Sequence, residues 1–217
     1  MTKIKICGLT ELEHIQVAMD LNIDYVGFVF ANSKRRIDPQ KVEIITRNLP
    51  KKIKKVGVFI SPTWTELERT IKEADLQVIQ LHGLQSKEVE EKIANDFFRK
   101  IQIEVIQAIN SDAPDLVSKM RQSSNLTYLI DAPNQGEEYM GGNGKVFNWK
   151  SLQNEIRSVP NQSFFIAGGL TSDNVQDACK LFQPYGVDVS SGVETNGRKD
   201  IEKMKKFVEK VRELTNV

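Results

Sequence analysis

Cysteine, histidine and net charge are all in short supply in this chain, and each shortage excludes a class of protein. Among the 217 residues are two cysteines, Cys7 and Cys179, too few for the disulfide framework of a secreted protein. The formal net charge of +1 gives no reason to expect nucleic acid or an anionic membrane as a partner. The two histidines, His14 and His82, show no metal-ligand spacing with cysteines or aspartates, so we expect no metal site.

Long apolar runs are also missing. The longest, Tyr25 to Ala31, is far shorter than the roughly 20 residues that a membrane-spanning helix needs. The first residues lack the apolar core of a secretory signal. We therefore expect a reduced, soluble, cytoplasmic protein, and the length favours a single domain, residues 1–217, around one core.

Apolar strand-like runs alternate with stretches of helical periodicity along the whole chain. Several runs are continuously apolar and rich in valine, isoleucine and phenylalanine, which is typical of strands covered on both faces. The predicted strands are Ile4–Cys7, Tyr25–Phe30, Lys55–Ile60, Val78–Leu81, Ile103–Ala108, Tyr128–Asp131, Phe164–Ala167 and Val187–Val189.

Amphipathic segments fill the gaps between these strands. Capping boxes, Thr10 with Glu13 and Thr63 with Glu66, predict two helix starts. Helical spacing of apolar residues marks the segments that contain Leu12, Ile15 and Met19; Val175, Ala178, Cys179 and Phe182; and Ile201, Met204, Val208 and Val211. Weaker patterns predict helices at Val42–Asn48, Val89–Asn95, Leu116–Gln122 and Ser151–Ser158.

Eight strands, each followed by a helix, predict an α/β fold, a closed (β/α)8 TIM barrel, rather than an open doubly wound sheet. One connection, Ala132 to Asn148, is long, rich in glycine and without periodicity. Loops of this length are usually functional or disordered, and this one follows a strand end, so we interpret it as an active-site flap.

Two residues at strand ends are candidates for acid–base chemistry. Cys7 ends the first strand, and a thiol near a cation or a helix N-terminus becomes a base or nucleophile. Asp131 ends an apolar strand, where partial burial raises the pKa of a carboxyl and suits it to donate a proton. A buried structural cysteine and a loop-capping carboxylate are the alternatives.

The loops after the seventh and eighth strands have the composition of a phosphate site. Gly168-Gly169 and Ser190-Ser191-Gly192 follow these strands, where many barrels bind phosphate on backbone N–H groups and a short helix. The segment Gly141 to Lys145, which contains Gly144, fails the P-loop pattern, because Val146 stands where serine or threonine is needed. A third backbone strip that contacts phosphate, or a flexible hinge, fits this segment better.

Three further residues, which follow or end two other strands, lie at the same end of the predicted barrel. Arg35 and Arg36 follow the second strand and could hold a carboxylate, or form a solvated surface. His82 could contact substrate or bond to its own loop, whereas His14 is interpreted as a solvated helical residue.

Four motifs resemble the phosphoribosylanthranilate isomerase family of tryptophan biosynthesis: Lys5 to Thr10 (KICGLT), Gly27 to Phe30 (GFVF), Gln80 to Gly83 (QLHG) and Val187 to Glu194 (VDVSSGVE). The resemblance implies an Amadori rearrangement of N-(5′-phosphoribosyl)anthranilate without metal or cofactor, by a monomer or homodimer. It implies Cys7 as base, Asp131 as acid, Arg35 at the anthranilate carboxylate, and Gly144, Gly168, Gly169 and Ser191 around the phosphate.

The chain departs from the family at two places. The usual Ser-Pro-Arg reads Ser33-Lys34-Arg35 with Arg36 beside it, which leaves open which arginine meets the carboxylate. Asn143 and Asn148 replace a hydroxyl and a carboxylate in the predicted flap. The alternatives are a histidine-pathway isomerase or pentose-phosphate epimerase, which use aspartates, and a catalytically silent phosphosugar-binding barrel.

Overall fold

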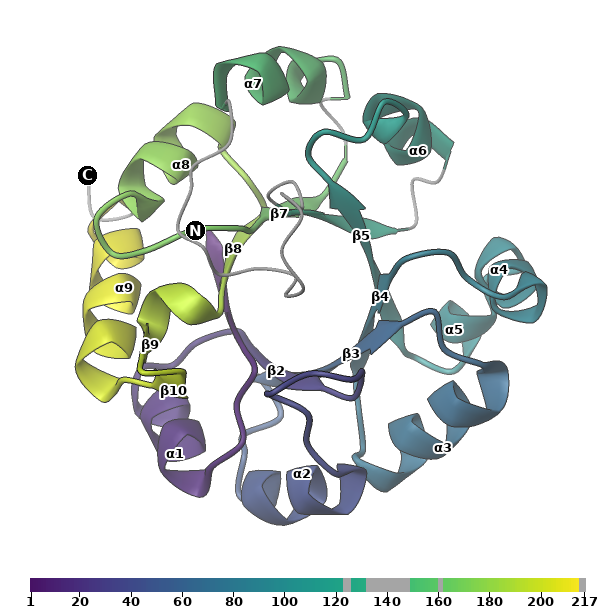
Figure 1. The fold of residues 1–217 in the computed structure, drawn as a ribbon, viewed down its shortest axis with the longest axis horizontal. Coiled ribbons are helices and arrows are strands. Elements are labelled where there is room, and N and C mark those ends of the chain that lie inside the picture. Colours follow the sequence, from purple (N-terminus) through teal and green to yellow (C-terminus); the bar gives the residue numbers. More distant parts are fainter. Residues whose placement is uncertain (123–125, 132–148, 160–161, 215–217) are drawn as a thin grey trace. The chain divides into compact units, whose positions relative to one another are not determined.

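The computed structural model contains eight long strands in the order β1 to β8 of a closed barrel, with helices between the strands (Figure 1). This confirms the predicted (β/α)8 barrel. The structure describes residues 1–122, 126–131, 149–159 and 162–214. The predicted flap, with Asn143, Gly144 and Asn148, lies outside the described residues.

Every predicted strand is present, within two residues of the predicted bounds. Most residues of these strands are buried, because a strand between barrel interior and helices has no solvent-facing side. In chain order the strands are β1 (Lys3–Cys7), β2 (Tyr25–Val29), β3 (Lys54–Ile60), β4 (Val78–His82), β5 (Glu104–Asn110), β6 (Thr127–Asp131), β7 (Phe164–Ile166), β8 (Gly186–Val189) and the short β9 (Glu194–Thr195) and β10 (Arg198–Lys199).

A helix is present in every segment where the sequence predicts one. The helices are α1 (Leu12–Asp20), α2 (Pro39–Thr46), α3 (Trp64–Glu73), α4 (Lys87–Ala94), α5 (Phe97–Lys100), α6 (Leu116–Gln122), α7 (Trp149–Arg157), α8 (Val175–Phe182), the 3-10 helix η1 (Ser191–Val193) and α9 (Ile201–Glu213). Within the described part of the chain, no helix is long and apolar enough to cross a membrane.

One compact unit comprises Cys7–Ala108. Its strands β2 to β5 pair in parallel, and helices α1 to α4 lie outside them (Figure 1). The second predicted helix start is confirmed, since Thr63 is the N-cap of α3 and its hydroxyl accepts a hydrogen bond from the Glu66 N–H at 3.2 Å. Asp38 caps α2 in the same way, ahead of Pro39, whose missing N–H is not needed at the first helical position.

The predictions for α1 are partly wrong. The helix begins at Leu12 with Glu11 as its N-cap, and the Glu11 side chain makes no capping bond, so the predicted Thr10–Glu13 box does not start it. The buried face consists of His14, Ile15 and Ala18, whereas Leu12 is exposed. His14 is therefore a buried residue, not a solvated one.

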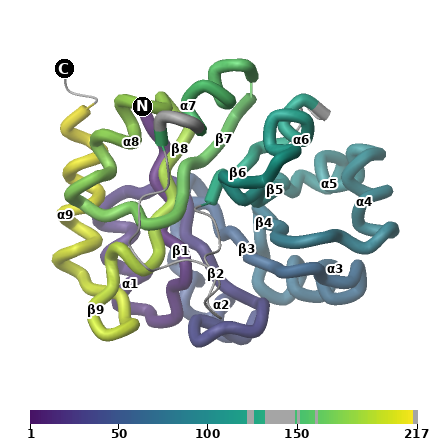
Figure 2. Tube along the Cα trace, turned by 45° about the horizontal axis from the view of Figure 1, so that its top comes forward, coloured from purple at the N-terminus to yellow at the C-terminus, as the bar shows by residue number. Residues whose placement is uncertain are grey.

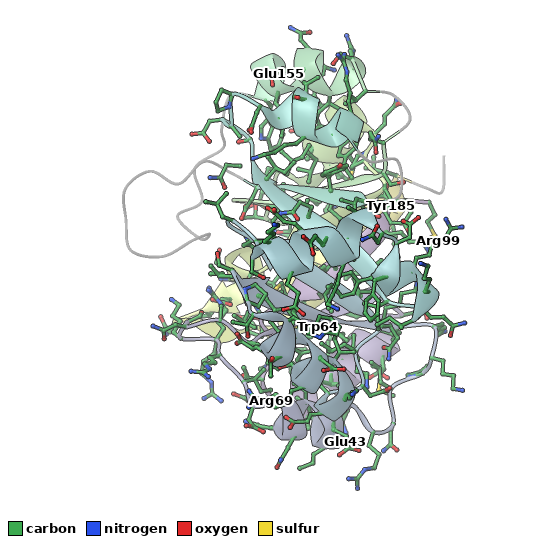
Figure 3. All side chains as sticks on the ribbon, turned by 90° about the vertical axis from the view of Figure 1, so that its right-hand side faces the viewer. Glu43, Trp64, Arg69, Arg99, Glu155 and Tyr185 are labelled. Atoms are coloured by element: carbon green, nitrogen blue, oxygen red, sulfur yellow. The ribbon has the colours of Figure 1, made fainter. Side chains whose placement is uncertain are left out.

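A short helix that the periodicity did not predict, α5, packs on α3 in this unit. Trp64 lies on α3 (Figure 3). The Phe97 ring meets the Trp64 ring edge-on with centroids 5.2 Å apart, and Phe98 packs beside both. Lys92 of α4 places its ammonium 4.1 Å from the Trp64 ring centroid. These contacts join α3, α4 and α5 by aromatic burial and a cation–π interaction.

The other compact unit comprises Met1–Ile6 and Ile109–Val217. In it β1 pairs with β8, β6 with β7, and β7 with β8, all in parallel. Helices α7, α8 and α9 lie outside these strands, and α8 and α9 lie side by side (Figures 1 and 2). The single-domain organisation stays a prediction.

Candidate functional site

Cys7 lies at the end of β1 and is almost fully buried. The chain turns immediately after it, where the N–H groups of Gly8 and Leu9 both donate to the Gly27 carbonyl, at 2.9 and 3.0 Å. Gly8 has φ +78°, a left-handed conformation that glycine adopts without strain. The turn holds the backbone of Cys7 against β2, so the thiol has a defined position.

The two arginines after β2 differ in exposure. Arg36 is exposed, and its backbone forms a bridge to Val29. Arg35 is half-buried, and its backbone N–H donates to the Ser33 hydroxyl at 3.1 Å. A half-buried guanidinium binds a carboxylate more strongly than a fully solvated one, because water competes less for its donors.

His82 ends β4 and is half-buried beside Gln80, which is almost fully buried on the same strand. Gln80 Nε2 lies 2.6 Å from His82 Nε2. An amide nitrogen can only donate, so in this contact the acceptor is His82 Nε2. Gln80 Oε1 is buried with no hydrogen-bond partner, so this strand end offers a polar acceptor.

In the other unit, Asp131 ends β6 and is half-buried. Its backbone carbonyl accepts a hydrogen bond from the Ser111 N–H at 2.8 Å. This bond anchors the main chain of the predicted acid at the end of β6.

The loop after β7 turns sharply at Gly168 and Gly169, whose φ angles are +83° and +67°. Asn174, the N-cap of α8, ties this turn down: its amide donates to the Gly169 carbonyl at 2.9 Å and accepts from the Thr171 N–H at 2.8 Å. The turn thus runs directly into the N-terminal end of a helix, the end that favours anions.

The loop after β8 is the 3-10 helix η1, with Ser190 as its N-cap. A Cβ built on Gly192 would lie 1.8 Å from the Leu170 carbonyl oxygen. Only glycine fits such a contact, so the backbones of the loops after β7 and β8 touch here. The structure therefore places Gly192 of the second loop against Leu170, the residue after Gly169, and a phosphate site formed by Gly168, Gly169, Ser190, Ser191 and Gly192 stays a prediction.

The sequence interpretation missed two buried ion pairs in this unit. Lys5 Nζ lies 2.9 Å from Asp188 Oδ1 between the register partners of β1 and β8. Lys199 Nζ lies 2.6 Å from Glu194 Oε1, with both side chains almost fully buried. The position of Lys5 inside the otherwise apolar predicted strand Ile4–Cys7 could have indicated a buried, paired lysine.

One group of potential metal ligands stands out among the described residues. Single ligand atoms of Glu11, Glu13 and His14 lie within 4.8 Å of one another at the start of α1. The positive end of the helix stabilises carboxylates there and opposes a bound cation. We assign this group no metal.

A closed parallel barrel with a glycine turn after β7 and a short helix after β8 defines the class of (β/α)8 barrels that have the loop architecture of a phosphate site. The family profile of N-(5'phosphoribosyl)anthranilate (PRA) isomerase matches residues 4–210. The chain belongs to this family.

Individual relatives agree. N-(5'-phosphoribosyl)anthranilate isomerase of Streptococcus mutans is 43% identical over 98% of this chain and 100% of its own. The crystal structure of phosphoribosyl anthranilate isomerase from Thermotoga maritima matches with a TM-score of 0.84 and 33% identity, covering 98% of this chain and 100% of that one. A further structure of the enzyme, in complex with reduced 1-(o-carboxyphenylamino)-1-deoxyribulose 5-phosphate, matches with a TM-score of 0.79 and 29% identity, at the same coverage.

Proposed function

We propose that this protein isomerises N-(5′-phosphoribosyl)anthranilate to 1-(2-carboxyphenylamino)-1-deoxyribulose 5-phosphate. The observation that carries the proposal is the match to the family along residues 4–210, joined by a solved relative that binds the reduced form of this product. The partner is then a phosphorylated small molecule. A monomer or homodimer in the cytoplasm stays our expectation.

The reaction needs one acid and one base. Asp131 protonates the furanose ring oxygen, and the C1′–O bond breaks as the anthranilate nitrogen forms a Schiff base. Cys7, as thiolate, then removes the C2′ proton, and the electron pair flows to the iminium nitrogen to give an enolamine. Tautomerisation of the enolamine returns a proton to C1′ and leaves the C2′ ketone. The substrate's own nitrogen is the electron sink, so the residues need only move protons.

The surroundings of the two residues support these roles. The turn at Gly8 fixes the main chain of Cys7, and the Ser111 bond fixes that of Asp131, so each group is held at a strand end. General acid–base catalysis depends on such fixed geometry before it depends on pKa.

The anionic ends of the substrate require separate contacts. Arg35 binds the anthranilate carboxylate in this proposal, supported by its partial burial, whereas Arg36 is exposed. His82 is a further substrate contact. The phosphate binds the backbone N–H groups around Gly168, Gly169, Ser190, Ser191 and Gly192, and Gly144 joins them by its sequence position alone.

Turnover of the substrate tests the proposal directly. The purified protein should consume N-(5′-phosphoribosyl)anthranilate, so that the fluorescence of this substrate decays as a single exponential at low substrate concentration. A protein that binds the phosphosugar but does not consume it would be a silent binding barrel, and the proposal would be wrong.

Variants then test the assigned roles. Cys7→Ser and Asp131→Asn should each lower kcat by about 10²- to 10⁴-fold, the usual contribution of a general acid or base. Cys179→Ala is the matched control, because Cys179 lies on the buried face of α8, and its kcat should stay native. Native kcat in both Cys7→Ser and Asp131→Asn would refute the acid–base assignment.

The arginine assignment has its own matched pair. Arg35→Met should raise KM about 10- to 100-fold, the worth of a charge-assisted hydrogen bond. Arg36→Met removes the same group from an exposed neighbour and should leave KM unchanged. The reverse result would assign the carboxylate contact to Arg36.

A further inference from the structure

A buried lysine lies beneath the loop after β8. The chain leaves β8 at Val189, passes through Ser190 and η1, and then forms the small hairpin of β9 and β10 before α9 begins. Lys199, at the end of β10, is 8% exposed as a whole residue and 3% exposed in its side chain. A lysine is buried this deeply only when its charge and its three donor protons all find partners.

The hairpin fixes where this lysine lies. Its two turn residues, Asn196 and Gly197, have φ angles of +51° and +77°, the left-handed pair of a two-residue type I′ turn. This turn sets the antiparallel register, in which Lys199 stands directly opposite Glu194. The hairpin lies beside the start of α9 (Figure 1), where the Lys203 ammonium also donates to the Glu194 carbonyl at 2.7 Å.

Three atoms of the described residues accept hydrogen bonds from the Lys199 ammonium. It donates to Glu194 Oε1 at 2.6 Å, to the Ser190 carbonyl at 2.9 Å and to the Ser190 hydroxyl at 3.3 Å. The Glu194 carboxylate compensates the charge of the lysine. The ammonium therefore serves as a fixed hydrogen-bond donor to Ser190 more than as a free positive charge.

The bond to the Ser190 carbonyl also orients the next N–H group. The peptide between Ser190 and Ser191 is planar and trans, so its N–H points opposite to its C=O. Drawing the carbonyl toward Lys199 turns the Ser191 N–H away from Lys199. The far side of the loop is fixed as well, because Gly192 packs on the Leu170 carbonyl.

We propose that Lys199, neutralised by Glu194, is a positioning residue that aims the backbone N–H group of Ser191 at the substrate phosphate. This inference rests on the proposed function, which assigns the phosphate to that loop. Lys199 does not touch the phosphate in this arrangement. Its contribution is to hold the Ser191 N–H group in place before the anion arrives.

Inorganic phosphate, as a competitive inhibitor of turnover, is the probe for this role. Lys199→Met should raise the Ki of phosphate about 10- to 100-fold and raise KM in parallel, with kcat nearly unchanged. A purely structural residue would not separate KM from kcat in this way. Lys206→Met is the matched control, because Lys206 pairs with Asp173 on the exposed surface of the same unit.

The single variant takes the Lys199 ammonium away from the buried Glu194 carboxylate, which destabilises the fold. The double variant Lys199→Met/Glu194→Leu removes both charges, and such replacements are often neutral or stabilising. We expect it to recover the native urea midpoint and to keep the weakened Ki of phosphate. Recovery of the native Ki in the folded double variant would overturn the inference.

The same assays separate this inference from the proposed function. Absence of turnover by the native protein would overturn the proposed function, and the inference with it. Turnover that phosphate does not inhibit would overturn the assigned phosphate loop and therefore the inference. Native turnover with native phosphate inhibition, and a double variant that equals it, would overturn the inference alone.

Discussion

Replacing Gly27 by alanine tests how closely the backbone of β2 holds the proposed base, Cys7. A Cβ at position 27 would lie 2.9 Å from Cys7 Sγ, 3.0 Å from its Cα and 3.2 Å from its Cβ. The crowded atoms include the main chain of β1, so the contact cannot be relieved by a rotation of the thiol alone. The end of β1 has to move.

The size of the movement follows from van der Waals distances. Non-bonded heavy atoms are comfortable at about 3.5–4.0 Å, so the new methyl group displaces Cys7 by about 0.5–1 Å. Misplacement of a reacting group by about 1 Å can lower a rate about 10²-fold. We therefore expect kcat to fall about 10- to 100-fold, and the free energy of unfolding to fall by about 1–3 kcal/mol through overpacking.

Gly57→Ala separates the two effects. Gly57 lies on the neighbouring strand β3, where a Cβ would meet three side-chain atoms, none of them of Cys7: Leu76 Cδ1 at 2.5 Å, Phe59 Cε2 at 2.8 Å and Phe30 Cε2 at 3.1 Å. Urea titration and the fluorescence assay on both variants should show similar losses of stability and a loss of kcat in Gly27→Ala alone. Equal kcat in the two variants would refute the proposed link between Gly27 and the base.

Three further predictions concern stability. Lys5→Met leaves Asp188 buried without its partner and should lower the free energy of unfolding by about 3–5 kcal/mol, measured by urea titration, whereas Lys5→Met/Asp188→Leu should recover most of this. Burial raises the pKa of the Cys179 thiol to about 11, although a hydrogen bond with Thr2 opposes the shift. The unfolded thiol, with an ordinary pKa of 9.0, ionises first, so stability is complete below pH 9 and falls up to pH 11. The native protein should lose about 3 kcal/mol more than Cys179→Ala over this range, and parallel pH curves would contradict the assignment. Thr63→Ala should cost about 1 kcal/mol by removing the cap of α3, and an unchanged melting temperature would show that the cap is not needed.

The barrel itself was readable from the sequence because parallel strands in such a fold are buried on both faces. A run such as Tyr25 to Val29 is apolar at every position, and the helices between the runs show their own period. The proposed acid and base were visible for a related reason. Cys7 and Asp131 end their strands, and strand ends are where a barrel places chemistry.

The buried face of α1 could not be predicted from hydrophobicity alone. Leu12 is exposed, and the buried face is built on His14, Ile15 and Ala18. Alanine carries little weight in an apolar pattern, and histidine was taken as polar. Tertiary packing therefore decided which side of this helix faces the core.

Two short elements were not predicted from the sequence, for different physical reasons. The helix α5 has four residues, too few to show a helical period, and it is stabilised by contacts with Trp64. The hairpin of β9 and β10, by contrast, has a strong local signal, because Asn196-Gly197 is the preferred pair of a type I′ turn. That signal was available and would have placed Lys199 opposite Glu194.

Two of the buried lysines, Lys5 and Lys199, show where such local reasoning stops. Lysine is among the residues least often buried, so a sequence places Lys5 and Lys199 on the surface by default. What reverses this is a partner, and the partner of Lys5, Asp188, stands at the other end of the chain. For Lys199 the deciding acceptor is the main-chain carbonyl of Ser190. Every residue has such a carbonyl, so the residue type gives no sign of this contact. Groups that touch a substrate can be found by their chemistry. Groups that only position such contacts can be recognised only in the folded structure, because their role depends on how close they lie to a backbone atom that is distant in the sequence.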